Sequence, residues 1–420
     1  MADIALQVCD SNIPDNPLSR PGTPSGPIYF RGIQVFRGIA AACVVLYHVN
    51  AYMAAVFGDK NTLFRHFDVL FSLGWCFFFV VSGFLMAYLI TSGTRYFLPR
   101  RLLRIYPTYW LAVILVVAFR TIFFNITFHW NLARLLCLYP LGKDPEGLYY
   151  PLGVEWTLIY EIFFYFVCAF FANRFLRRAF PGFLLLWLVI IGVAAIFYRN
   201  HDYTLPNFTE IWFSTNNILF IGGALGFYLY RVLPPFKWLW TFPCFVFAIP
   251  VFVMAEHEIN RAGILRLLHR IGMDVTYPSL LFYTLGFLLI LVPWLAAEKN
   301  RPKSRRLLVL EKLGDYSYAL YLVHVPVILY IYMAAKANHP NHNALACLAL
   351  SCALIAGILL GRIDVRIHNR LKAFLGGKKA VSKAAPHRLG MANFNLPDSA
   401  AISRFAESRA PLDTSTPPAA

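Results

Sequence analysis

Two ionisable side chains lie within one apolar stretch near the start of the chain. Arg37 and His48 are eleven residues apart, close to three helical turns, so a helix places them on nearly the same face, about 16 Å apart along its axis. A charge inside a membrane is costly and usually faces a bundle interior or a wet cavity. Because histidine titrates near neutral pH, His48 can serve as a general base. The alternatives are that Arg37 reaches the cytoplasmic headgroups and that His48 is a buried, hydrogen-bonded histidine.

A carboxylate lies within a second apolar stretch. Glu161 is flanked by aromatic and aliphatic residues, and Tyr165 follows it by four positions, on the same helix face. A carboxylate in such surroundings needs a partner or has to become neutral. Glu161 is therefore a catalytic candidate, and the alternative is a structural ion pair with an arginine of another helix. Glu155 lies six residues earlier on a different face, nearer the external end, and is the weaker candidate.

Two arginines share a face at the expected cytoplasmic mouth of the third apolar span. Arg101 and Arg104 are three residues apart, so a helix brings their side chains together. Two guanidinium groups on one face suit a polyanion such as phosphate. From spacing alone, ordinary membrane anchoring by positive residues is the favoured explanation of the pair.

A second histidine follows a stretch rich in tyrosine. His324 ends residues 313–324, and Asp315 and Ser317 have the side chains that usually begin a helix. The tyrosines of this stretch favour packing and the aromatic belt of a membrane interface rather than ligand binding.

The composition predicts a polytopic, all-α membrane protein. Of 420 residues, 59% are hydrophobic and 14% are charged, and the mean hydropathy is +0.57, whereas soluble domains are about half apolar and a quarter charged. The net charge of +17 comes with no nucleic-acid-binding motif. The eight cysteines include no CxxC pair and no metal-ligand spacing, so neither a metal site nor a disulfide framework is expected.

About ten apolar stretches approach the length of a bilayer span. We expect a cytoplasmic, disordered segment at 1–32, without a cleavable signal peptide, a membrane domain at 33–361, and a basic, mostly disordered cytoplasmic tail at 362–420. The expected spans lie at 33–57, 68–91, 102–124, 152–172, 181–198, 212–231, 236–255, 278–297, 315–335 and 343–361.

Basic residues are concentrated in alternate loops. The loops on one side of the membrane, which include those before 102 and after 298, are rich in lysine and arginine. The loops on the opposite side are poorer in these residues, with 256–277 as the exception. The positive-inside rule then predicts that both termini are cytoplasmic.

Five motifs in order resemble those of the acyltransferase-three family, bacterial multi-span proteins that O-acylate envelope and secreted glycans. They begin at Phe36, Phe78, Arg100, Trp156 and Leu313 and read FRGIAA followed by His48, FFVVSGF, RRLLRIYP, WTLIYEIFFY and LGDYSYALYLVH. The fourth is similar to the branch that acetylates exopolysaccharide. The chain lacks the appended esterase-like domain of some members, and it has Glu155 where related sequences often have glycine.

The resemblance implies a ten-helix core in a bacterial inner membrane and an acyl-CoA, usually acetyl-CoA, as a cytoplasmic co-substrate. His48 matches the essential first-helix histidine and Arg37 its partner. Arg101 and Arg104 match the RxxR pair and, with Arg37, are the expected donor-binding residues. Glu161 matches the motif glutamate, which would orient the imidazolium or hold an arginine. The supporting candidates are Ser82, Tyr165 and His324.

Two other functions fit the same residues. Intramembrane histidine, arginine and glutamate also serve as relays in transporters and exporters, although no internal repeat is evident. The second alternative function is that of a structural partner of polysaccharide assembly proteins. The acceptor is not identified: exopolysaccharide, lipid-linked saccharide, lipopolysaccharide, Nod-type oligosaccharide and small secreted metabolites stay open.

Overall fold

The computed structural model describes residues 30–59, 71–94, 96–124, 136–140, 142, 150–197, 206–261, 276–299, 307–338 and 341–375. Within these ranges the chain is helical and contains no β-strand, which confirms the all-α prediction. The described residues up to Lys372 belong to one compact unit, and the unit that follows contributes only the last three residues of the final helix. The predicted cytoplasmic N-terminal segment and most of the predicted tail lie outside the described residues.

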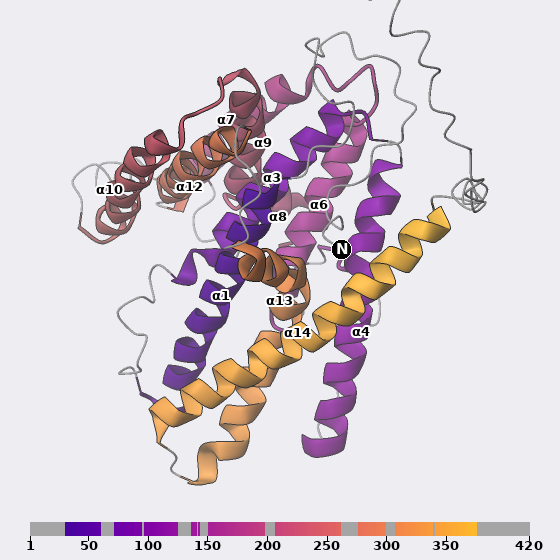
Figure 1. The fold of residues 1–420 in the computed structure, drawn as a ribbon, viewed down its shortest axis with the longest axis vertical. Helices are drawn as coiled ribbons and strands as arrows, with labels where there is room; N and C mark the ends of the chain where they lie inside the picture. The colour runs from indigo at the N-terminus through magenta and orange to yellow at the C-terminus, as the bar shows by residue number, and fades with distance from the viewer. Residues whose placement is uncertain are drawn as a thin grey trace, which may run out of the picture. The chain divides into compact units, whose positions relative to one another are not determined.

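Ten helices of sixteen residues or more occur in the described part of the chain, one at each expected span (Figure 1). They are α1 (Arg31–Phe57), α3 (Gly74–Thr91), α4 (Phe97–Phe124), α6 (Glu155–Phe171), α7 (Phe180–Phe197), α9 (Asn217–Val232), α10 (Thr241–Arg261), α12 (Thr276–Glu298), α13 (Leu308–Ala335) and α14 (His342–Leu375). The short elements are α8 (Phe208–Phe213), η2 (Trp238–Trp240) and η4 (Lys336–Asn338).

Seven helical segments in the described ranges are long and apolar enough to cross a membrane. They comprise α1, α3, α4, α12, α14, the segment Trp238–Ala255 and the segment Leu308–Asn338. The shorter apolar helices Phe180–Ile196 and Asn217–Val232 add to them. On α7 the outward residues include Leu185, Leu186 and Val189, all more than half exposed, as expected where lipid covers an apolar face. A membrane protein is confirmed, and the number of ten crossings stays a prediction.

Helices α4 and α13 begin earlier than predicted. Helix α4 begins at Phe97 instead of 102, because Pro99 falls in the first turn, where a missing N–H costs no hydrogen bond. Likewise α13 begins at Leu308, so the prediction that Asp315 and Ser317 start it is wrong. Its first turn carries Glu311, which favours a helix start and pairs with Arg31 of α1.

One expected span is interrupted. Residues 212–231 were expected to form a single helix, but α8 ends at Phe213 and α9 begins at Asn217. Asn207 caps α8 in a reciprocal capping box with Glu210. Asn217 Nδ2 donates to the carbonyls of Ile211 and Ser214 at 2.6 and 3.2 Å, which satisfies backbone groups at the break.

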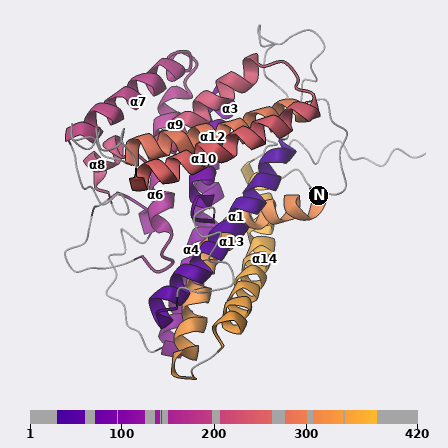
Figure 2. The ribbon, with the colours of Figure 1, turned by 90° about the vertical axis from the view of Figure 1, so that its left-hand side faces the viewer.

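Three helix pairs make the most extensive contacts: α1 with α13, α3 with α9, and α10 with α12. In Figure 2, α10 and α12 lie side by side and run across the direction of α1 and α13. Glycine permits the first two contacts, because a Cβ at Gly314 would lie 1.9 Å from the carbonyl oxygen of Gln34 on α1. On the second pair, a Cβ at Gly223 would lie 1.9 Å from the carbonyl oxygen of Val80. Such close backbone approach through small residues is typical of membrane helices.

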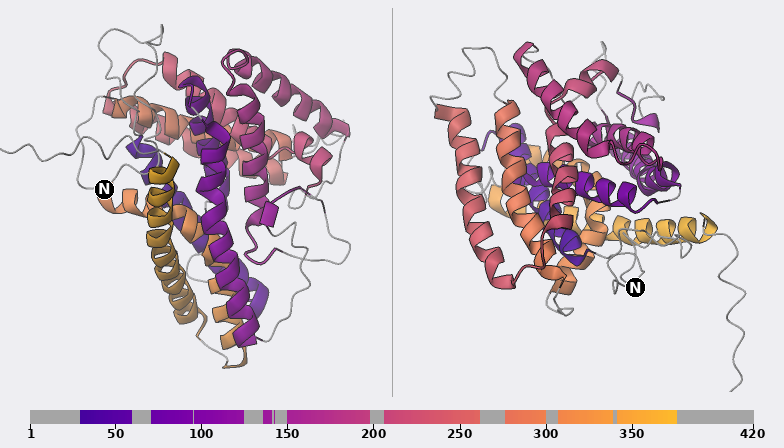
Figure 3. Two further views of the ribbon diagram at one scale, coloured as in Figure 1. Left: turned by 90° about the vertical axis from the view of Figure 1, so that its right-hand side faces the viewer. Right: turned by 90° about the horizontal axis from the view of Figure 1, so that it is seen from above.

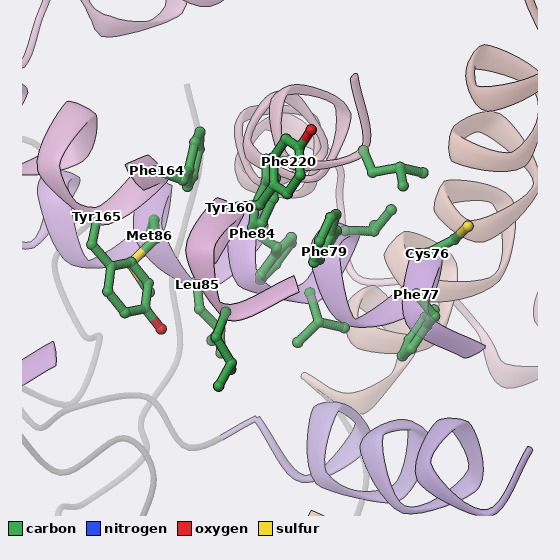
Figure 4. Close-up of a cluster of buried hydrophobic side chains, with 14 of the residues drawn as sticks. Cys76, Phe77, Phe79, Phe84, Leu85, Met86, Tyr160, Phe164, Tyr165 and Phe220 are labelled. Carbon is green, nitrogen blue, oxygen red and sulfur yellow. The ribbon is translucent and has the colours of Figure 1, made fainter. Parts of the chain in front are cut away.

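Stacked aromatic rings fill the core between α3, α6 and α9. The ring centroid of Phe220 lies 4.2 Å from that of Phe79 and 4.7 Å from that of Phe164 (Figure 4). Tyr160, fully buried beside them, donates its hydroxyl to Ser214 Oγ at 2.8 Å. This packing fixes α3 and α6 relative to each other, and both helices carry residues of the site.

Candidate active site

A cavity of about 100 Å³ lies among α1, α3, α4, α6 and α13. Its volume is sufficient for several water molecules. Both polar and apolar side chains line it: Arg37, Trp75, Phe78, Phe79, Val81, Ser82, Leu85, Met86, Arg101, Arg104, Ile105, Thr157, Leu158, Glu161, Tyr165, Ser317, Tyr318 and Tyr321. Six of the eight residues predicted from the sequence therefore meet at this cavity, and His48 and His324 are the two that do not line it.

The three arginines of the cavity differ in their partners. Arg104 Nη1 donates to both carboxylate oxygens of Asp364 at 2.9 Å. Asp364 is buried and also accepts from Thr108 Oγ1 at 2.5 Å. The aspartate comes from α14, which lies beside α4 in the left view of Figure 3. The charge of Arg104 is therefore balanced within the protein.

Arg37 and Arg101 have no such counter-charge within ion-pair distance among the described carboxylates. Arg37 Nη1 reaches only the side-chain oxygen of Gln34, at 3.5 Å. Since both are half-buried and line the cavity, their donors are directed to a space that holds one carboxylate, Glu161. Glu161 acts on both guanidinium groups from beyond ion-pair distance, and Asp315 acts on Arg37 from outside the cavity lining. Within the lining, these two guanidinium groups face one carboxylate, which favours an anionic ligand.

Glu161 sits among hydroxyl groups of the same cavity. Tyr165, one helical turn along α6, donates to Glu161 Oε1 at 2.5 Å, and Ser82 Oγ of α3 donates to the same oxygen at 3.4 Å. Figure 4 shows Tyr165 on the same side of the core as Leu85 and Met86, which also line the cavity. The structure therefore brings Glu161 together with the arginines, and no described contact joins it to His48.

His48 and His324 form a separate pair. The Nδ1 atom of His48 lies 2.9 Å from the carbonyl oxygen of Val44 and 3.2 Å from His324 Nε2. The two rings meet edge to face with centroids 4.9 Å apart. His324 is fully buried, and its Nδ1 lies 2.8 Å from the carbonyl oxygen of Tyr321. Each histidine is thus held by the backbone of its own helix and by the other ring.

The rings of Tyr47 and Tyr52 flank His48. The centroid of Tyr52 stacks 5.9 Å from that of His48, and the Tyr47 ring meets it edge-on at 5.2 Å. Neither tyrosine was singled out by the sequence, because the aromatics of such a stretch are typical of packing.

A tyrosine and a threonine connect the cavity with the histidine pair. Tyr321 lines the cavity, and its ring centroid lies 5.6 Å from that of His324, one turn further along α13. Its hydroxyl lies 2.9 Å from Thr157 Oγ1 of α6, which itself donates to the carbonyl of Val154 at 2.8 Å. Tyr321 therefore contacts both the cavity and His324, and its hydrogen bond to Thr157 joins α6 and α13 there.

Glu155 has a structural position. It is fully buried at the start of α6 and accepts from the backbone N–H groups of Leu152 and Val154 at 2.8 and 3.0 Å. Gly153 between them has φ +76°, and a Cβ there would lie 3.2 Å from Val325. Glu155 therefore fixes the turn that packs against α13 next to His324.

The sequence missed Asp364, Thr108, Thr157 and Tyr321. Asp364 falls in a stretch that was assigned to the tail, although a lone acid in an otherwise basic run is a signal for a buried ion pair. Among the described residues no group of three or more histidine, cysteine, aspartate or glutamate side chains could hold a metal ion.

A family model described as an acyltransferase domain matches residues 30–362 of the chain, most of its length. No curated protein and no solved structure matches the chain. The matched range contains every predicted site residue and both helices of the histidine pair, and Asp364 lies two residues beyond its end. The chain therefore belongs to the acyltransferase-three family and is a membrane acyltransferase.

Proposed function

We propose that this protein transfers an acyl group, acetyl in the first instance, from a cytoplasmic acyl-CoA to a hydroxyl group of a saccharide. Exopolysaccharide and lipid-linked saccharides are the acceptors that we propose. The observation that carries the proposal is the pair of guanidinium groups without an ion-pair partner among the described carboxylates, Arg37 and Arg101, in a cavity whose wall includes Tyr321, the ring neighbour of His324.

The donor end rests on charge. Coenzyme A carries phosphates, and planar guanidinium groups bind phosphate through paired N–H donors. Arg37 and Arg101 have donors to spare, whereas Arg104 is engaged by Asp364. We therefore assign phosphate binding chiefly to Arg37 and Arg101, with Arg104 as a fixed positive wall of the same cavity.

The distance between charge and base fits a long donor. Arg37 and His48 are both on α1, eleven residues and about 16 Å apart along the helix axis. The extended pantetheine arm of coenzyme A joins its phosphates to the thioester over a distance of this order. Phosphates at Arg37 therefore allow the thioester to reach His48, provided that the contact between Tyr321 and Thr157 opens.

The chemistry at His48 is acyl transfer with a general base. His48 Nε2 takes the proton of the acceptor hydroxyl while the oxygen attacks the thioester carbonyl carbon. The carbon–sulfur bond then breaks, and the leaving thiolate receives the proton from the imidazolium. Glu161 acts at the other end, where it holds Tyr165 and Ser82 and offsets part of the positive charge of the arginines.

Two experiments test the function. Purified protein in lipid nanodiscs should bind acetyl-CoA and release free coenzyme A when acceptor is present, which neither an exporter nor a scaffold does. Absence of turnover with every saccharide acceptor tested, together with transport of one of them, would overturn the proposal. Mass spectrometry of glycans from a deletion strain should show the loss of one acetyl increment and identify the acceptor.

The membrane placement is part of the proposal. Both termini are cytoplasmic in the bacterial inner membrane, from the bias of basic residues to alternate loops. Reporter fusions after residues 60, 145 and 205 should read external, and fusions after 97, 176 and 303 internal. Inverted readings at the first two spans would overturn this orientation.

A further inference from the structure

We propose that His324 is a positioning residue: it holds the imidazole of His48 in the tautomer that a base requires and stabilises the imidazolium that forms there. The inference rests on the proposed role of His48 as a general base. It assigns to α13 a direct part in the chemistry of α1, through the contact between His324 Nε2 and His48 Nδ1 at 3.2 Å.

The carbonyl groups around the pair fix its protons. A carbonyl oxygen only accepts, so His324 Nδ1, 2.8 Å from the oxygen of Tyr321, carries a proton and donates it. The Nε2 of His324 then has a free lone pair. His48 Nδ1 in turn donates to the carbonyl of Val44 at 2.9 Å and shares the same proton with His324 Nε2.

This arrangement leaves one nitrogen of the pair available. With its proton on Nδ1, His48 presents an unprotonated Nε2, and no described polar group contacts that atom. An unprotonated ring nitrogen is what a base needs to accept a hydroxyl proton. His324 thus fulfils towards His48 the role that a buried hydrogen-bond acceptor has towards the base of a catalytic triad.

The partner is neutral, as its burial requires. His324 is fully buried, and an isolated carboxylate in that place would pay a large desolvation cost. A neutral imidazole lone pair accepts from Nδ1–H at lower cost, and the hydrogen bond strengthens when His48 becomes charged. The rings of Tyr52, Tyr47 and Tyr321 surround the pair, and among described residues no acid or base other than these two histidines hydrogen-bonds to either ring.

A purely structural role predicts a different response to substitution. The carbonyls of Tyr321 and Leu320 satisfy His324 Nδ1 within α13, so any structural role of Nε2 is limited to stability, which substitution would lower without changing transfer per folded molecule. The Nε2 atom of His324, by contrast, contacts His48 Nδ1 on another helix. The proton on that Nδ1 leaves Nε2 of His48 as the unprotonated nitrogen.

The test compares two substitutions in two backgrounds. His324→Leu removes the acceptor, and His324→Gln restores an oxygen near the position of Nε2. In the protein with His48, we expect His324→Leu to lower acetyl transfer about ten- to hundredfold without changing the KM for acetyl-CoA, and His324→Gln to recover much of the loss. In the His48→Gln background, neither substitution should reduce transfer further.

Tyr332→Phe is the matched control. Tyr332 Oη donates to the carbonyl of Val49, the residue after His48, at 3.0 Å, and joins the same two helices through a bond that involves neither imidazole. This variant should lower thermal stability while transfer per folded molecule stays near wild type. Equal losses from His324→Leu and His324→Gln, or an additive loss in the His48→Gln background, would overturn the role of His324. Near-normal transfer by His48→Gln alone would instead overturn the proposed role of His48.

Discussion

The arginine cavity and the histidine pair share two helices, α1 and α13, yet they have opposite properties. The cavity contains open space and two guanidinium groups that form no ion pair with a described carboxylate, with Arg37 from α1 and Tyr318 from α13 in its wall. The histidine pair, further along both helices, is neutral and closed by hydrogen bonds. The difference is the basis on which we propose ligand binding at the cavity and proton transfer at the histidine pair.

The largest expected effect is at the histidine pair. His48→Gln should reduce acetyl transfer about a hundredfold to ten-thousandfold, because an amide cannot take up a proton. Binding of acetyl-CoA, measured by calorimetry, should stay near wild type, since the cavity is unchanged. Two outcomes would contradict the assignment of donor binding to the cavity and proton transfer to the histidine pair. One is normal transfer per folded molecule in His48→Gln, and the other is a loss of donor binding in this variant.

The second effect belongs to the cavity. Arg101→Ala should raise the KM for acetyl-CoA about ten- to hundredfold, because it removes charge-assisted hydrogen bonds to phosphate. Arg101→Lys should recover only part, since an ammonium group cannot form the paired bonds of guanidinium. Steady-state kinetics with varied donor separates KM from kcat. An unchanged donor affinity in Arg101→Ala and Arg37→Ala would make both arginines membrane anchors.

A smaller effect on transfer is expected where charge is already balanced. Asp364→Asn leaves Arg104 without its carboxylate and should lower stability by about 1–3 kcal/mol. Thermal unfolding in nanodiscs measures that loss. The KM for acetyl-CoA should change less than in Arg101→Ala. A larger change would mean that Arg104 binds the donor directly.

The smallest effect is expected at Ser82. Its hydroxyl contributes one long hydrogen bond, 3.4 Å to Glu161, so Ser82→Ala should change transfer by less than about tenfold. Tyr165→Phe removes the shorter bond to the same oxygen and is the matched comparison. A greater loss in Ser82→Ala than in Tyr165→Phe would give Ser82 a direct contact with substrate.

Much of the cavity could be predicted from the sequence because its members break an apolar pattern. Arg37, Arg101 and Glu161 stand out as ionisable groups in membrane-length stretches, and such groups turn inward. The rule places them inside the bundle, whereas their meeting at one cavity that excludes His48 depends on how the helices pack.

The partnerships could not be predicted, because they depend on how helices pack. Asp364 lies 260 residues from Arg104 in sequence, and His324 lies 276 residues from His48. The sequence is enough to predict which residues share a face within one helix. The axial alignment of α1 with α13, however, depends on glycine contacts that a single sequence does not specify. The early start of α13 was missed for a related reason: Glu311 is stabilised by Arg31 of another helix.

The glycine contact between α1 and α13 has a mechanical consequence. The backbone of α13 at Gly314 lies against the backbone of α1, and further along both helices the Tyr332 hydroxyl of α13 donates to the carbonyl of Val49 on α1. A slip of one residue along either helix would shift the rings by about 1.5 Å and turn them by about 100°, which separates His48 from His324. We therefore expect these two helices to stay fixed relative to each other, and any movement that admits a donor or an acceptor to involve α3, α4 and α6, which line the remaining sides of the cavity.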